Sequence, residues 1–93
     1  MEEKVRVHAV INGRVQGVFF RAETRRTANI HGVSGWVRNR PDGTVEAVFE
    51  GAREAVQAVL NWCNKGPDYA VVTDVAVSWQ EYHGEFDGFK VRY

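Results

Sequence analysis

The sequence predicts an α+β sandwich in which two helices pack on one face of an antiparallel-type sheet. Two observations favour this fold class: segments with strand and helix periodicity alternate along the 93 residues, and both helical segments carry apolar residues on one side. The length fits a single domain over residues 1–93, and an apolar content of 44% is enough for one modest core.

The first strand and the first helix are predicted from their periodicities. Residues 5–11 place Val5, Val7, Ala9 and Ile11 on one face, as in a half-buried strand. Residues 20–31 are predicted as a helix with a weak apolar stripe, ended by Gly32. The residues expected on its inner face are Phe20, Thr24, Thr27, Ala28 and His31.

A hairpin and a second helix follow. Residues 34–39 and 44–50 are expected to form two strands, because Pro41 presets a turn and Gly43 accepts a positive φ. Residues 52–65 give the clearest helical pattern, which the Gly-Pro pair after it ends. The apolar face of this helix contains Ala52, Ala55, Val56, Val59, Leu60, Trp62 and Cys63.

Two strands are expected in the last quarter of the chain. Val71, Thr73, Val75, Val77 and Trp79 alternate with mostly polar residues, and FKVRY (89–93) is a short final strand. The resulting order is β-α-β-β-α-β plus a short C-terminal strand. This order is that of a ferredoxin-like sandwich.

Composition and charge reduce the number of function classes that the chain can belong to. The formal net charge is zero, so we expect neither nucleic acid nor a membrane surface as a partner. The single cysteine cannot form an internal disulfide, and we see neither a signal peptide nor an apolar run of membrane-spanning length. We therefore expect a cytoplasmic monomer.

The segment GRVQGVFFR (13–21) lies between the first strand and the first helix. A helix N-terminus presents unpaired N–H groups, and Gly13 and Gly17 let the backbone curl into an anion-binding nest. Arg21 offers paired, planar donors to a phosphate. The segment thus predicts a phosphate cradle, although most glycine-rich loops are only turns. It matches neither a P-loop nor the dinucleotide-binding glycine pattern.

Asn39 is the second candidate site residue. A right-handed crossover makes the first two strands parallel, which brings Asn39 to the edge that carries the loop. On the residues alone, Asn39 either faces the loop or caps the following turn, and the second arrangement is the more common.

Taken together, INGRVQGVFFR (11–21) and GWVRNRPDGTVEAVFEG (35–51) closely resemble the two signature segments of the acylphosphatase family. WCNKGP (62–67) and FKVRY (89–93) also look like this family. The resemblance implies hydrolysis of acyl phosphates to carboxylate and inorganic phosphate, with Arg21 binding phosphate and Asn39 orienting the attacking water. The implied phosphate loop consists of Val15, Gln16, Gly17, Val18, Phe19, Phe20 and Arg21.

The residue types suit this chemistry without a cofactor or a metal. A carboxylate leaving group, whose conjugate acid has a pKa of ~4, needs no general acid. An amide suits water positioning, because a carboxylate ~4 Å from a phosphate charge would cost 4 kcal/mol at an effective dielectric constant of 20. His8, His31 and His83 show no metal-ligand spacing, and we expect none of them to bind a metal.

Two other functions are considered. An acylphosphatase-like module could hold phosphate or carbamoyl phosphate without turnover. An RNA-recognition domain shares the element order, but residues 44–50 lack its glycine pattern and basic flank. A last hypothesis concerns the chain end, where the terminal carboxylate of Tyr93 pairs with Arg21 and fixes its rotamer.

Overall fold

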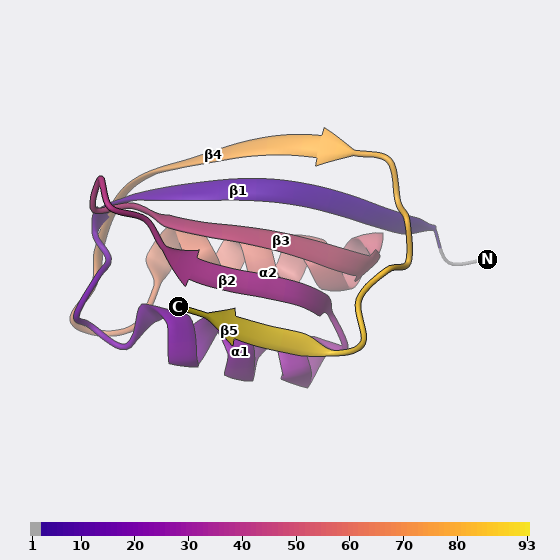
Figure 1. Cartoon of the computed structure of the whole chain (residues 1–93), viewed down its shortest axis with the longest axis horizontal. Coiled ribbons are helices and arrows are strands. Elements are labelled where there is room, and N and C mark those ends of the chain that lie inside the picture. Colours follow the sequence, from indigo (N-terminus) through magenta and orange to yellow (C-terminus); the bar gives the residue numbers. More distant parts are fainter. Residues whose placement is uncertain (1–2) are drawn as a thin grey trace.

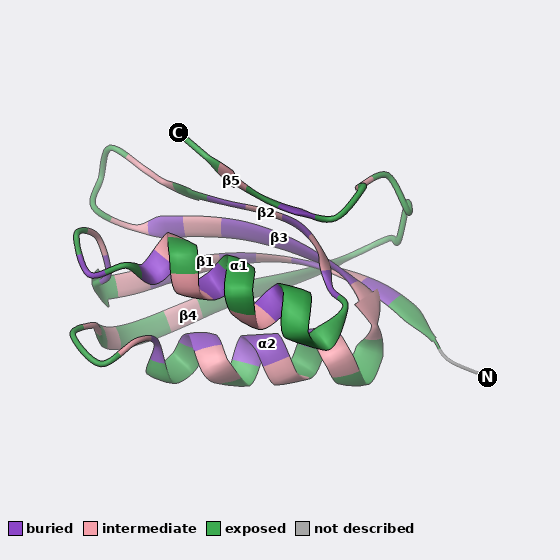
Figure 2. Cartoon of the chain, turned by 90° about the horizontal axis from the view of Figure 1, so that it is seen from below, coloured by how far each residue is buried: buried purple, intermediate pink, exposed green. Residues whose placement is uncertain are grey.

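The computed structural model describes residues 3–93, which form one sheet and two helices in the predicted order (Figure 1). The strands are β1 (Lys4–Arg14), β2 (Ser34–Asn39), β3 (Val45–Ala52), β4 (Val71–Gln80) and β5 (Phe89–Arg92). The helices are α1 (Phe20–His31) and α2 (Arg53–Lys65). Both helices cover the same face of the sheet, as Figure 2 shows.

The strand directions show one parallel pair in a sheet that was predicted as antiparallel in type. The strand order is β4-β1-β3-β2-β5, and β1 and β2 are both antiparallel to β3. β1 and β2 therefore run in the same direction, as the right-handed crossover requires. β5 pairs with β2 in parallel, so the sheet is mixed rather than wholly antiparallel.

The predicted inner face of β1 is confirmed, and that of α2 is confirmed except at Ala52, which is the last residue of β3. All four apolar residues expected on the inner side of β1 are buried, and they alternate with half-buried residues. The buried residues of α2 are Val56, Val59, Leu60 and Cys63. Burial raises the pKa of the Cys63 thiol to about 12, so this thiol is a neutral core group.

The inner face of α1 is narrower than predicted. Phe20, Thr24 and Ala28 are buried, whereas Thr27 is only partly buried and His31 is exposed. The Thr24 hydroxyl donates a 2.7 Å hydrogen bond to the carbonyl of Phe20, one turn earlier. This bond satisfies the buried hydroxyl and explains why a polar residue is accepted in the core.

The alternation predicted for β4 is wrong at the start of the strand. The register between β1 and β4 shifts just after Asn12, where β4 contains one additional residue. Val72 therefore packs against the core, while Val71 is 56% exposed. Val77 and Trp79 lie opposite inward-facing residues of β1 but remain exposed, because β4 is an edge strand.

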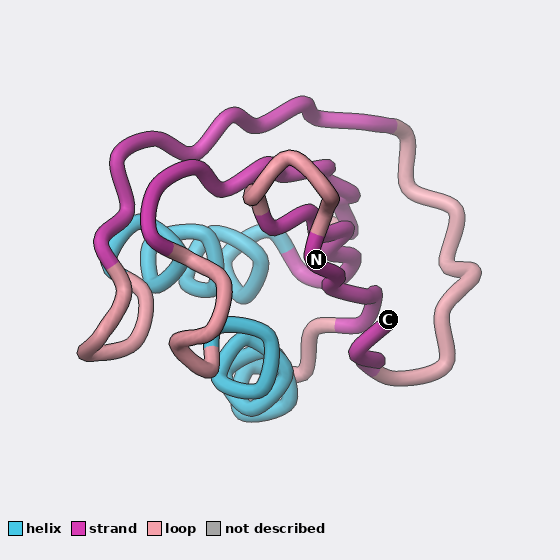
Figure 3. The backbone as a smooth tube through the Cα atoms, turned by 60° about the vertical axis from the view of Figure 1, so that its left-hand side comes forward, coloured by secondary structure: helices cyan, strands magenta, loops and turns pink. Residues whose placement is uncertain are grey.

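A strap formed by residues 81–88 joins β4 to β5 and passes on the side of the sheet away from the helices (Figure 3). The buried Glu50 carboxylate of β3 anchors the strap by accepting hydrogen bonds from the backbone N–H groups of His83 (2.9 Å), Gly84 (3.3 Å) and Glu85 (3.3 Å). Burial opposes ionisation of Glu50, but these donors and Arg6 outweigh it and hold its pKa below the usual value. The anchor thereby fixes the segment that leads into β5.

Candidate active site

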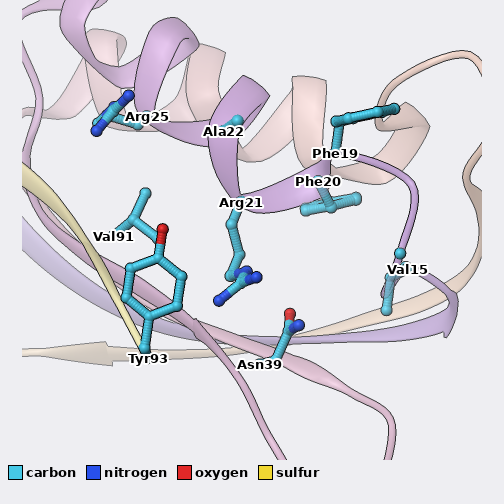
Figure 4. Close-up of a pocket in the computed structure, with 10 residues that line it drawn as sticks. Val15, Phe19, Phe20, Arg21, Ala22, Arg25, Asn39, Val91 and Tyr93 are labelled. Atoms are coloured by element: carbon cyan, nitrogen blue, oxygen red, sulfur yellow. The ribbon is translucent and has the colours of Figure 1, made fainter.

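A cavity of about 290 Å³ lies where α1 begins, beside the ends of β2 and β5 (Figure 4). It is lined by Val15, Gly17, Phe19, Phe20, Arg21, Ala22, Arg25, Asn39, Val91 and Tyr93. The structure thus brings Arg21 and Asn39 to one cavity together with four more residues of the predicted phosphate loop. Figure 4 shows the Arg21 guanidinium and the Asn39 amide extending toward the same space.

The backbone of the loop is curled by two left-handed residues. Gly17 has a φ of 73° and Phe19 a φ of 65°. Phe19 is the N-cap of α1, and its carbonyl accepts the N–H of Glu23 at 3.0 Å. Left-handed residues of this kind let backbone N–H groups converge into a nest that attracts anions, next to the positive end of the helix dipole.

The two predicted loop residues outside this cavity are Gln16 and Val18. The Gln16 side-chain amide donates to the carbonyl of Arg40 at 2.7 Å and to that of Thr44 at 2.8 Å. These bonds hold the loop against the turn that follows Asn39. They therefore fix the position of the phosphate loop relative to Asn39. Val18 is buried in the core, with 6% of its surface exposed.

The chain end positions Arg21. One guanidinium N–H of Arg21 donates to the carbonyl of Arg92 at 3.5 Å, and the guanidinium carbon lies 4.7 Å from the centroid of the Tyr93 ring. A guanidinium has five N–H donors, so one such bond leaves most of them for an anion. Within residues 3–93, no ion pair joins Arg21 to the Tyr93 carboxylate, so the ring, not the carboxylate, makes this contact.

Sequence reasoning missed three lining residues, Ala22, Arg25 and Val91. Arg25 lies outside the inner face predicted for this helix and is exposed, and it also lines the cavity one helical turn after Arg21. The spacing of four residues was the available signal, because residues i and i+4 share a helix face. Val91 reaches the cavity because β5 pairs in parallel with β2, and no local sequence pattern encodes that pairing.

Outside the cavity, Glu46 is paired with His8 and Arg38. The Glu46 carboxylate lies 2.7 Å from the His8 ring and accepts a 2.6 Å hydrogen bond from Arg38. Burial opposes ionisation of Glu46, but these two partners outweigh it and lower its pKa.

Among residues 3–93, no three His, Cys, Asp or Glu side chains group together closely enough to hold a metal ion. No helix in that part of the chain has the length and apolar content needed to cross a membrane.

Comparisons with known proteins agree on one family. Residues 7–91 match the family model for acylphosphatase. A protein of Pelotomaculum thermopropionicum named acylphosphatase is 56% identical over 90 residues, which cover 97% of this chain and 98% of that protein. The crystal structure of acylphosphatase from Bacillus subtilis has a TM-score of 0.92 at 32% identity, covering 96% of this chain and 99% of that one. The structure of an acylphosphatase from Coxiella burnetii has a TM-score of 0.91 at 34% identity, covering 96% of this chain and 93% of that one. The chain therefore belongs to the acylphosphatase family.

Proposed function

We propose that this protein is an acylphosphatase, which hydrolyses the carboxyl–phosphate bond of acyl phosphates to a carboxylate and inorganic phosphate. The observation that carries the proposal is the shared cavity of Arg21, at the start of α1, and Asn39, at the end of β2. The curled loop between β1 and α1 supports it, because this backbone can bind a phosphate group. Membership of the family gives independent support.

Phosphate binding is assigned to the loop of residues 15–21. Its backbone N–H groups and the N-terminal end of α1 surround the phosphoryl oxygens, and Arg21 holds two of them with its planar fork. Arg25, one turn later on the same cavity wall, adds positive potential. These groups stabilise the charge that spreads over the phosphoryl oxygens in the transition state, which is the main task in phosphoryl transfer.

Water positioning is assigned to Asn39. The amide donates to and accepts from a water molecule, which attacks phosphorus in line with the bond to the carboxylate. That phosphorus–oxygen bond breaks, and both of its electrons leave with the carboxylate. Asn39 cannot take the proton of the water, so a phosphoryl oxygen of the substrate takes it. The products are a carboxylate and protonated inorganic phosphate.

Neither a metal ion nor a general acid has a role in this proposal. The leaving carboxylate is stable without protonation, and the cations Arg21 and Arg25 provide charge stabilisation. Phosphate monoesters are expected to be poor substrates, because their alkoxide leaving groups need a proton donor.

The test is a turnover assay on acetyl phosphate in excess chelator, with a phosphate monoester as comparison and Asn39→Ala as the low-activity control. We expect phosphate release from acetyl phosphate in chelator and little release from the monoester. Phosphate binding without turnover would favour the non-catalytic module that holds phosphate or carbamoyl phosphate. Activity that disappears in chelator and returns with magnesium would contradict the mechanism.

We further propose that the protein acts as a cytoplasmic monomer on small acyl phosphates. Its zero formal net charge supports the absence of nucleic-acid and membrane partners. Light scattering of the purified protein tests the monomer, and a gel-shift assay at moderate salt tests nucleic-acid binding.

A further inference from the structure

The face of the sheet that points away from the helices carries cations on β2 and β5, which lie side by side (Figure 1). In the register of this parallel pair, Lys90 lies opposite Trp36 and Arg92 lies opposite Arg38. Val37 is buried in the core, so the alternation along β2 puts its two neighbours, Trp36 and Arg38, on the outer face. The exposed Lys90 and Arg92 also lie there, because the residue between them lines the candidate active site. We call Arg38, Lys90 and Arg92 the outer-face cluster.

Two guanidinium groups of the cluster stack on the indole of Trp36. The guanidinium carbon of Arg92 lies 4.6 Å from the centroid of the ring, and that of Arg38 lies 5.6 Å from it. Stacking uses the flat faces of the guanidinium groups and leaves the N–H groups at their edges able to donate. The indole therefore orders two forked donors before a ligand arrives, which lowers the entropy cost of binding an anion.

The charges of the cluster are only partly compensated. Arg38 donates a 2.6 Å hydrogen bond to Glu46, the residue opposite it on β3, which also contacts His8. Within residues 3–93, neither Lys90 nor Arg92 forms an ion pair. Like charges directly opposite each other on neighbouring strands destabilise a sheet, so the placement of Arg38 opposite Arg92 is unfavourable for the sheet itself. An anion bound between them removes this repulsion.

A cavity of about 190 Å³ adjoins the cluster, bounded by β2, the strap and β5, with Lys90 and Arg92 in its lining. Two carboxylates, Glu85 and Asp87, line it as well, and Glu85 forms an ion pair with Arg6. Both carboxylates precede β5, whereas Arg92 is the last residue of that strand. An anion bound at the Arg92 end of the cluster therefore lies at the other end of β5 from these carboxylates.

We propose that the outer-face cluster is a second anion site, separate from the candidate active site, and that it binds a small linear polyanion with two or three neighbouring phosphate groups. Arg38 and Arg92 each present a fork that can hold two oxygens of one phosphate, and Lys90 adds a point charge. These cations lie on adjacent strands, whose spacing is about 4.8 Å, so they match several linked phosphates better than a single one. The proposal does not depend on the proposed function.

The two anion sites lie on opposite faces of the same strand ends. Arg38 directly precedes Asn39, and the carbonyl of Arg92 accepts an N–H of Arg21 at 3.5 Å. A polyanion held between Arg38 and Arg92 thus joins the ends of the two strands that position both groups. Because the candidate active site is also expected to attract phosphate, the binding experiment uses a variant in which that site is weakened.

Titration calorimetry with tripolyphosphate at low ionic strength tests the site in the Arg21→Ala variant, which lacks the main cation assigned to phosphate binding. We expect this variant to bind tripolyphosphate. Adding Arg92→Gln should weaken the binding by about tenfold, and adding Lys90→Gln by about threefold, because each removes a charged donor. Adding Arg92→Lys instead should cost less than Arg92→Gln, because the charge remains and only the fork is lost.

Arg53→Gln in the same background is the matched control. Arg53 is another arginine stacked on a tryptophan, with its guanidinium carbon 5.4 Å from the centroid of the Trp79 ring, but it is paired with Glu3. Arg53→Gln removes the same charge as Arg92→Gln and should change the affinity by less than about twofold. A thermal melt of each variant without ligand shows that it is folded.

The absence of tripolyphosphate binding in Arg21→Ala would overturn the second site. Equal losses of affinity from Arg92→Gln and Arg53→Gln would also overturn it, because they would indicate non-specific attraction to positive charge. A single-stranded oligonucleotide that binds more tightly than tripolyphosphate, and that Arg92→Gln releases, would show that the ligand is a nucleic acid and not a small polyanion. Turnover of acetyl phosphate by the wild type tests the proposed function separately.

Discussion

The guanidinium carbon of Arg21 lies 4.7 Å from the centroid of the Tyr93 ring, and the same guanidinium bonds to the carbonyl of Arg92. The final strand therefore orients the side chain to which we assign phosphate binding. Because β5 is anchored through the strap to Glu50, this orientation depends on a carboxylate on the opposite face of the sheet.

Replacing Tyr93 tests the orienting contact. Tyr93→Ala removes the cation–π contact and should weaken competitive inhibition by inorganic phosphate by about twofold to fivefold. Tyr93→Phe keeps the ring and should retain the wild-type inhibition constant. Equal inhibition constants in all three proteins would show that the ring does not position Arg21.

Asn39→Ala should lower kcat by on the order of a hundredfold, with a much smaller effect on phosphate inhibition. The reason is that the amide orients water, whereas Arg21 and the loop bind the phosphoryl group. Steady-state kinetics on acetyl phosphate and phosphate inhibition separate the two effects. A kcat close to that of the wild type would leave Asn39 with only a role in the adjacent turn.

Inorganic phosphate should stabilise the folded protein through Arg21. At a hundredfold excess over its dissociation constant, phosphate should raise the free energy of unfolding by about 2.7 kcal/mol. Thermal melts at fixed ionic strength measure this gain, with chloride as the matched control. Arg21→Ala should fold and lose most of the gain, while Arg21→Lys should keep part of it, because a point charge replaces the planar fork. An equal gain in Arg21→Ala would place the bound phosphate elsewhere.

Glu50→Gln should destabilise the protein at neutral pH by about 2 kcal/mol, because three backbone donors and Arg6 lose a charged acceptor. The pKa of Glu50 is lowered in the folded state, so its contribution is present above the unfolded pKa and disappears as pH falls toward the folded value. Urea unfolding should therefore show a difference between wild type and variant that is full at pH 7 and shrinks below about pH 5. A difference that stays constant with pH would contradict an ionised Glu50 anchor.

The sequence alone determined the elements whose signals are local. The bounds predicted for α1, residues 20–31, coincide with the observed helix Phe20–His31, because glycine and helical periodicity act within a few residues. The inner face of β1 followed from a strict alternation of apolar residues, and the edge shared by Asn39 and the loop followed from the handedness of the crossover.

The tertiary structure decided the contacts between segments that are distant in sequence. The additional residue in β4 could not be predicted, because a bulge depends on how two strands pair rather than on the pattern within either one. The parallel placement of β5 depends on the strap and its buried anchor, Glu50, and it alone brings the Tyr93 ring to Arg21. Local periodicity carries no information about these contacts between distant segments, because packing across the whole domain fixes them.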